Sequence, residues 1–353
     1  MRKSLPLLAA AALGLAAIAQ PASAQDLTTA TFGGTTIWAG GGVQFLTLPD
    51  MKFTGRLDGN GNFRRQKNLE GDWLDAGPAA AGGIETALGF WGNARVTGTL
   101  KGFWAGVETD DHTSCRGPVC VVIDPTGAVT ISGPPVLKTK ADREADYWGG
   151  QFELKFARAE AVEVRPNLYR NDYFIVGADV RGIDQDTKLR GHFAGDPIYT
   201  YKETLDTTYY GAYIGLGGEY AIPLISGIGS GLGLRTFISG RAGLYAAETD
   251  YDGSFTSFVR PFDSTLELTR DTKDADELAF IGSISLETRK QIGPRSSLSL
   301  WTDYEFISSV PKMNYINANH ATRIEDEAIF ASRTMIRLNI GLGPTQLYEE
   351  PLR

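Results

Sequence analysis

The strongest regularity along the chain is a strict alternation of apolar and polar residues. In residues 147–157, for example, Trp148 and Phe152 fall on one face, whereas Glu153 and Lys155 fall on the other. A period of two over this length predicts a β-strand rather than a helix. The same pattern recurs and predicts ten strands, at residues 35–47, 83–91, 95–108, 146–157, 171–182, 208–222, 232–247, 277–291, 296–308 and 328–343.

Short and long connections alternate between these strands through most of the chain. The short ones carry turn residues, as at 92–94 and 293–295. The long ones are polar and rich in Gly, Pro and Asp, and they cover residues 49–82, 109–145, 183–206, 249–276 and 309–327. Two further apolar segments, 255–259 and 265–268, would raise the strand count to twelve, but we interpret them as a hairpin that extends above a membrane.

The first 24 residues have the features of a secretory signal peptide. Arg2 and Lys3 precede an apolar stretch at 5–19, and Ala22-Ser23-Ala24 fits the small-x-small cleavage pattern. The apolar stretch is short for a membrane anchor, which needs about 20 residues. We therefore expect two parts, a signal peptide at 1–24 and one exported domain at 25–353, because no shift in composition indicates a linker.

An exported chain without an apolar helix is either a soluble β-protein or a membrane β-barrel, since only a closed barrel satisfies strand backbones in lipid. Alternating short turns and long loops favour the barrel. So do charges at mid-strand positions, where small residues between them leave room in a narrow lumen. Aromatic residues near predicted strand ends would form girdles at the membrane interfaces; they are Trp38, Trp91, Trp104, Tyr147, Trp148, Tyr173, Tyr209, Tyr210, Tyr220, Tyr245, Phe306 and Phe330.

With this signal end and these strands, the chain resembles a Gram-negative outer-membrane β-barrel protein of the porin-like class. The resemblance implies an all-β fold, a single transmembrane antiparallel up-and-down barrel of about ten strands (twelve as the alternative), with short periplasmic turns and long outer loops. It also implies localisation in the cell outer membrane, contact with outer-membrane lipid, and insertion by the barrel-assembly machinery. Members usually end on an aromatic residue of the last strand, whereas this sequence ends at Arg353. It therefore departs from the usual assembly signal, and an internal signal at 336–342 is the alternative.

The polar faces of the strands predict which side chains point into the lumen. The residues expected to line a pore are Arg95, Lys101, Glu153, Lys155, Arg235, Arg241, Glu287, Arg289, Asp303, Glu305, Arg333 and Arg337; Arg181, Glu85, Asp179 and Glu219 share these faces. Basic residues outnumber acidic ones, which favours anions if the lumen holds water. The favoured function is passive diffusion of small hydrophilic solutes. The alternative is a closed structural or adhesive barrel, in which these charges pair and long acidic surface loops carry the function.

Charge and residue usage exclude several other functions. A formal net charge of −8 argues against nucleic-acid binding, which needs a basic face. Cys115 and Cys120, with four residues between them in an exported loop, predict a local disulfide. The three histidines, His112, His192 and His320, all fall in predicted loops, and the sequence contains neither G-x-S-x-G nor H-E-x-x-H. We therefore expect no enzymatic activity, no cofactor and no metal site.

Overall fold

A computed structural model describes the chain at residues 34–49, 54–57, 63–65, 75–116, 120–123, 129–132, 136–165, 168–222, 234–258, 264–293, 295–314 and 323–342. The expected signal peptide at 1–24 and His320 lie outside the described residues, as do the side chains of Cys115 and Cys120. Within the described part there is no helix long and apolar enough to cross a membrane.

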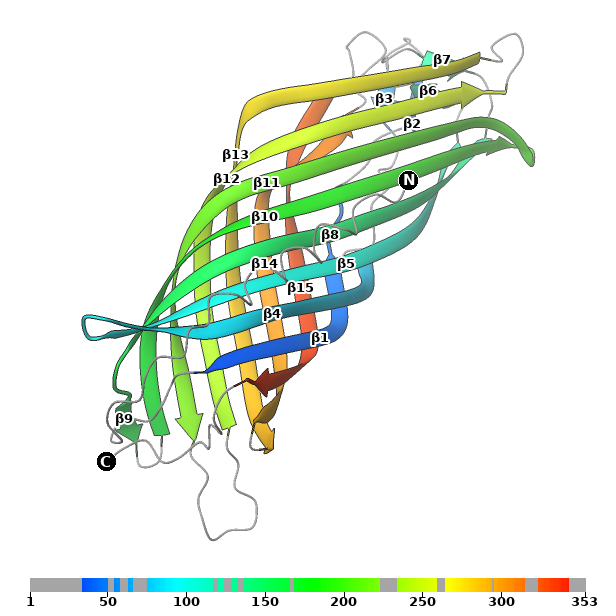
Figure 1. Ribbon diagram of the computed structural model, residues 1–353. Coiled ribbons are helices and arrows are strands. Elements are labelled where there is room, and N and C mark those ends of the chain that lie inside the picture. The colour runs from blue at the N-terminus through cyan, green and yellow to red at the C-terminus, as the bar shows by residue number, and fades with distance from the viewer. Residues whose placement is uncertain are drawn as a thin grey trace.

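The fold is an antiparallel sheet of eleven strands that closes on itself (Figure 1). Ten strands follow one another around the ring in chain order: β1 (Thr35–Leu46), β4 (Asp75–Trp91), β5 (Ala94–Arg116), β8 (Val136–Arg158), β10 (Leu168–Phe193), β11 (Asp196–Ile222), β12 (Leu234–Ser257), β13 (Ser264–Gly293), β14 (Ser296–Asn314) and β15 (Arg323–Gly341). The eleventh, β9 (Val162–Arg165), pairs with the start of β10. Pairing of β15 with β1, from Thr36 opposite Gly341 to Leu46 opposite Ala331, closes the ring.

Each of the ten predicted strands lies within or closely overlaps one strand of this ring. The hairpin interpretation of segments 255–259 and 265–268 is also consistent with the pairing. Ser257 of β12 lies opposite Ser264 of β13, so the two segments continue existing strands and add none to the ring.

The predicted long loops are shorter than expected, because the strands extend far into them. The clearest correction is 183–206, where β10 and β11 stay paired up to the two-residue turn Ala194-Gly195. Both turn residues have positive φ, 53° and 100°, as the favoured tight hairpin turns require. The sequence obscured these extensions because their outward side chains are charged and because polar residues such as Gln185, Thr187 and Glu203 interrupt the inward apolar face.

Four short strands form a second sheet from segments predicted to be loops. They are β2 (Thr54–Leu57), β3 (Phe63–Arg65), β6 (Cys120–Ile123) and β7 (Val129–Ser132), in the order β3-β2-β6-β7. Figure 1 shows this sheet at the end of the ring opposite β9. The ring therefore has a short-turn end, which carries β9, and an extended end, which carries the small sheet.

The outer face of the ring divides into an apolar belt and a charged extension. Exposed apolar side chains form the belt, including Phe174, Ile214, Leu216, Leu244, Ile284, Leu286, Leu300, Phe330, Ile336 and Leu338. Beyond it, four aspartates on adjacent strands lie opposite one another in register: Asp146 of β8, Asp184 of β10, Asp206 of β11 and Asp250 of β12. We call these four residues the acidic row. Further toward the extended end the outward positions carry Lys188 and Lys202, which lie opposite each other in register.

Candidate functional site in the lumen

The structure places all twelve predicted pore-lining residues on the inward face of the ring. Their strands alternate so that odd-numbered residues point inward, which puts Glu153 and Lys155 of β8 on the same side as Asp303 and Glu305 of β14. The face assignment follows from the period of two alone. Whether these residues line a pore depends on whether the lumen is open, and that part stays a prediction.

A charged layer joins opposite walls of the ring at its middle. Arg181 of β10 binds Glu305 of β14 through Nη1 and Oε1 at 2.8 Å, and it binds Asp179 Oδ2 through Nη2 at 2.7 Å. Tyr147 Oη donates to Glu305 Oε2 at 2.6 Å, and Arg333 Nη2 lies 3.5 Å from Asp303 Oδ2. We call Asp179, Arg181, Tyr147, Asp303, Glu305 and Arg333 the sealing layer. All six are buried, and two guanidinium groups are paired with three carboxylates here, through contacts between adjacent strands and across the lumen.

Aromatic rings hold the guanidinium groups in place beside this layer. The Arg333 guanidinium carbon lies 3.8 Å from the centre of the Phe103 ring, and that of Arg337 lies 3.5 Å from Trp301 and 4.2 Å from Trp38. Cations over aromatic faces are attracted by the ring quadrupole, and the attraction grows when water is excluded. These rings fill space that charged side chains alone would leave to water.

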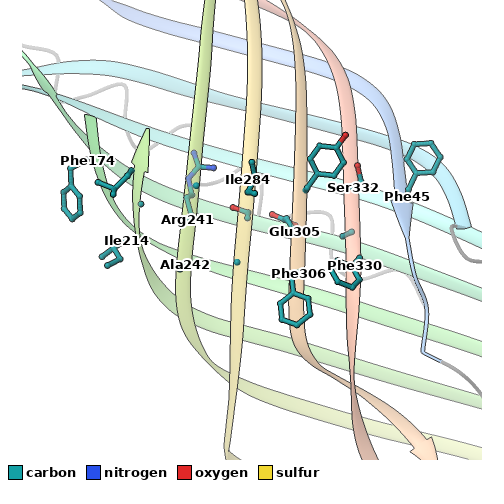
Figure 2. A pocket seen from close by; sticks show the side chains of 17 residues that line it. Phe45, Phe174, Ile214, Arg241, Ala242, Ile284, Glu305, Phe306, Phe330 and Ser332 are labelled. Carbon is teal, nitrogen blue, oxygen red and sulfur yellow. The ribbon is translucent and has the colours of Figure 1, made fainter. Parts of the chain in front are cut away.

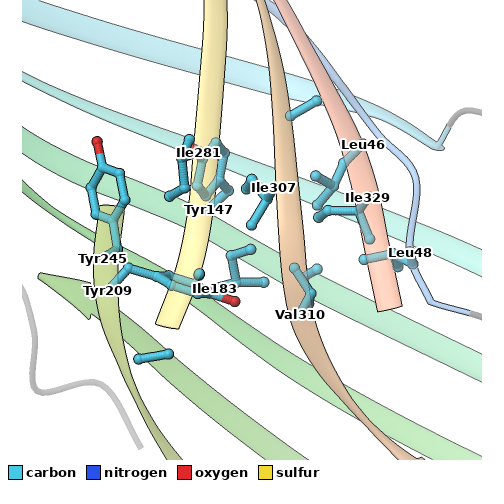
Figure 3. Packing of buried hydrophobic residues seen from close by; sticks show 14 of the residues in the cluster. Leu46, Leu48, Tyr147, Ile183, Tyr209, Tyr245, Ile281, Ile307, Val310 and Ile329 are labelled. Atoms are coloured by element: carbon cyan, nitrogen blue, oxygen red, sulfur yellow. The ribbon is translucent and has the colours of Figure 1, made fainter. Parts of the chain in front are cut away.

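An apolar cluster fills the lumen on the extended side of the sealing layer (Figure 3). Tyr147, Ile183, Tyr209 and Tyr245 come from β8, β10, β11 and β12. They meet residues of β13, β14 and β15, the last residue of β1 and one residue just after it: Ile281, Ile307, Val310, Ile329, Leu46 and Leu48. The Tyr209 hydroxyl donates to the Ser309 carbonyl oxygen at 2.8 Å, so β11 bonds directly to β14 across the ring. Two layers, one charged and one apolar, therefore occupy the lumen in succession.

A small cavity lies on the short-turn side of the sealing layer. It has a volume of about 90 Å³ and polar walls, with Lys101, Lys155 and Arg241 among its lining residues. Exposure falls from this end inward: the side chains of Glu85 and Lys155 are 31% and 16% exposed, whereas that of Arg181 is 3% exposed. Solvent therefore reaches into the lumen from the short-turn end and stops at the sealing layer. We call this space the lower cavity.

Sequence reasoning missed the aromatic part of the lumen. Trp38, Tyr147, Tyr173, Tyr209 and Tyr245 were expected in the interface girdles but are buried on the inward face. The available signal was the spacing to neighbouring charges. Tyr147 and Glu153 are an even number of positions apart on one strand, so both side chains point to the same face. Proximity to a strand end outweighed that signal and gave the wrong side for these five residues. Trp91, Trp104 and Tyr210 are exposed, as girdle residues would be.

The apolar belt contains a broad hollow on the outer surface, shown in Figure 2. Its volume is about 1080 Å³, and Phe174, Ile214, Ile284, Phe306 and Phe330 line it. Parts of Arg241 and Glu305 also border it, because the wall between the hollow and the lumen is a single sheet.

The two described histidines lie far from the sealing layer, in the extension. The His112 side chain is exposed, and its backbone N–H donates to Asp111 Oδ1 at 2.6 Å. Lys140 of β8 lies opposite His112 in register, and Lys138 lies opposite His192. Among the described residues no group of three or more His, Cys, Asp and Glu side chains could hold a metal ion.

Comparisons with known proteins give a resemblance at the level of the fold class. No family model matches the chain, and no curated protein matches it. The structures similar to it are bacterial outer-membrane β-barrel proteins. The outer membrane protease OmpT from Escherichia coli shares 11% identity with a TM-score of 0.45, over 91% of this chain and all of that one. A FadL homologue from Pseudomonas aeruginosa shares 11% identity with a TM-score of 0.26, over 87% of this chain and 90% of that one. An anion-selective porin from Comamonas acidovorans shares 8% identity with a TM-score of 0.16, over 87% of this chain and 98% of that one.

Proposed function

We propose that the chain is an outer-membrane barrel with a closed lumen, which acts through the strands that extend beyond the membrane. The observation that carries this proposal is the sealing layer, where Arg181 of β10 and Glu305 of β14 bind each other across the ring. Eight strands leave an interior that side chains just fill, and here large aromatic residues achieve the same in a ring of ten. The closed barrel is thus better supported than passive diffusion of solutes.

The apolar belt supports the placement in a membrane. Its exposed side chains, such as Leu216 at 69% and Leu278 at 73%, would be costly in water over so large an area. Lipid is the partner that covers such a face on a closed ring of strands. The even number of strands puts the short turns and both chain ends of the ring on one side, which we assign to the periplasm. Assembly by the barrel-assembly machinery is part of the same proposal.

The extension supports a role at the cell surface. From Asp184 to the tip of β10 the strand continues for about ten residues, or roughly 34 Å at 3.4 Å per residue. Ion pairs link some of its outward residues, with Asp142 of β8 bound to Lys140 of the same strand at 2.7 Å and to Arg190 of β10 at 2.9 Å. A rigid, charged projection of this length suits contact with another surface or with envelope polysaccharide.

Single-channel recording of the refolded mature protein in a planar bilayer tests the closed lumen. We expect a folded, heat-modifiable barrel that passes no current. Stable conductance steps would contradict the closed lumen and favour passive diffusion. An anion-leaning reversal potential that weakens in Arg241→Ala would then assign the inward charges to a water-filled pore.

Shortening the β10–β11 hairpin tests the role of the extension. Gln185 lies opposite Leu205, so residues 186–204 can be replaced by Asn-Gly, a favoured two-residue turn, without a change of register. We expect cells displaying this variant to lose surface attachment while the barrel still inserts. Unchanged attachment by a variant present at wild-type levels on the surface would contradict an adhesive role. A structural role would then remain, and the sensitivity of the cell envelope to detergent would test it.

We also propose that the chain is not an enzyme. Assays of protease and lipase activity on the wild type, His112→Ala and His192→Ala test this. Activity in the wild type that either substitution abolishes would overturn it.

A further inference from the structure

The lower cavity has more basic than acidic groups, and its acidic groups are already paired. Lys155 lies 3.5 Å from Glu85, Arg241 lies 3.0 Å from Glu153, and Arg289 lies 3.1 Å from Glu287. Each cavity carboxylate thus has a cation of its own. Two further cations line the same space, namely Lys101 of β5 and Arg337 of β15.

Lys101 has no carboxylate partner in the described part of the chain. No ion pair within 4.0 Å and no hydrogen bond involves its ammonium group, and the centre of the Trp301 ring lies 5.9 Å from Nζ. Glu153 and Asp303 attract it from beyond ion-pair distance, but each is already paired, with Arg241 and Arg333 respectively. An ammonium group taken out of water without a counter-charge in direct contact is disfavoured. Lys101 lies between the sealing layer and the end of the lumen that solvent reaches. Either a negative charge binds beside its ammonium group, or that group loses a proton and becomes neutral.

Arg337 lines the same cavity, and not all of its N–H donors have an acceptor among the described residues. Its side chain is 7% exposed and stacks between Trp38 and Trp301, and its one ion pair, to Glu287, is long at 3.5 Å. The buried Nε of Arg337 has no hydrogen-bond partner in the described structure. A buried, unpaired donor costs the free energy of its lost hydration, so a ligand that accepts from it is stabilised.

We infer that the lower cavity is a binding site for a small inorganic anion, held by the Lys101 ammonium and the Arg337 guanidinium. A volume of about 90 Å³ has room for a halide with water or a compact oxyanion, and gluconate, which is much larger and carries several hydroxyl groups, is expected to bind more weakly. The anion would supply the charge that Lys101 lacks and an acceptor for Arg337. The inference goes beyond the proposed function and does not depend on a closed lumen, because the cavity opens to the short-turn end in either case.

Unfolding midpoints of the refolded full-length protein in chloride and in gluconate, at equal ionic strength and pH, test the inference. A ligand that binds only the folded state stabilises it by RT ln(1 + [L]/Kd), so we expect a higher midpoint in chloride that rises with its concentration. Lys101→Met is expected to abolish the difference. The matched control Lys202→Met removes a lysine from the outer extension and is expected to keep it.

Three results would overturn the inference. Equal midpoints in the two salts would mean an empty or water-filled cavity and a neutral Lys101. A chloride effect that persists in Lys101→Met would place the anion elsewhere. If Lys101→Met fails to fold, crystals of the wild type grown in bromide decide the matter, since the site requires an anomalous peak within bonding distance of Lys101 Nζ and Arg337. Conductance, by contrast, reports only on the closed lumen.

Discussion

The ring of Tyr199 on β11 lies flat over Gly191 on β10, its direct partner in register. A Cβ atom at position 191 would lie 1.9 Å from Tyr199 Cε1, so only glycine fits. The same arrangement, an aromatic ring over the glycine directly opposite it, recurs around the barrel. The pairs are Trp38 over Gly83, Phe103 over Gly149, Tyr213 over Gly177, Tyr245 over Gly211 and Tyr173 over Gly217. Large inward rings can therefore lie along the wall, which lets the lumen fill without forcing the strands apart.

Gly191→Ala is expected to destabilise the protein by about 1–3 kcal/mol, the usual cost of overpacking. Tyr199 cannot easily move, since its ring stacks on Phe255 and its hydroxyl bonds Thr139 at 2.7 Å. The matched control is Gly240→Ala on the outer face, where the nearest atom to an added Cβ is 3.9 Å away. Urea unfolding of both variants checks the prediction. Equal stability would mean that the close contact between Tyr199 and Gly191 does not contribute to the free energy of unfolding.

Arg181→Met is expected to cost about 3 kcal/mol, because it leaves Glu305 and Asp179 buried without their cation. The double variant Arg181→Met/Glu305→Gln should recover part of the loss, since it removes the stranded charge. Arg170→Met breaks an exposed pair with Asp172, and its effect on stability is expected to be small because solvent screens such pairs. Denaturant titration of the three variants gives the comparison. An open, hydrated lumen would instead make Arg181→Met nearly as mild as Arg170→Met.

Much of the barrel was predictable because the period of two is a local property. Glu153, Arg241 and Arg337 alternate with apolar neighbours, so their faces follow from the sequence whatever the partner strands are. The connections between consecutive strands indicated, in the same local way, that each strand pairs with the next one along the chain. This is why both the ten strands and the inward charges were found.

The particular contacts across the lumen were not predictable, because they join residues far apart in the sequence. Arg181 meets Glu305 at a separation of 124 residues, which no local pattern encodes. Inward tyrosines such as Tyr147 look like girdle residues until the position of the membrane along each strand is known. The strand extensions were missed for a related reason, since Asp184 and Lys188 point outward into water and read as loop residues.

Ile284→Lys is expected to destabilise the barrel in lipid by about 2–4 kcal/mol, the range for a lysine near the middle of a bilayer-facing strand. Ile284 is 62% exposed on β13, so in water alone the same change would be nearly neutral. Asp252→Lys, outward on the extension of β12, is the control and should have little effect. Unfolding from phosphatidylcholine vesicles measures both. Similar stability for the two variants would show that the belt does not face lipid.

The acidic row should make the extension less stable as pH rises. Burial raises the pKa of Asp206 from its ordinary value of 3.8 to about 6, and repulsion from Asp184, Asp186 and Asp250 adds to the shift. The folded state thus holds this proton more tightly than the unfolded state does, so Asp206 favours folding at low pH and loses that contribution as pH rises from about 4 to 6. Asp206→Asn removes the repulsion, and we expect it to raise stability at pH 7–8 and to flatten the profile between pH 4 and 7. Unfolding titrations at pH 4.5, 6 and 8 test this, with the neighbouring non-titrating variant Thr208→Ala as control. A profile for Asp206→Asn as steep as the wild type's would show that the row is fully hydrated and does not couple to folding.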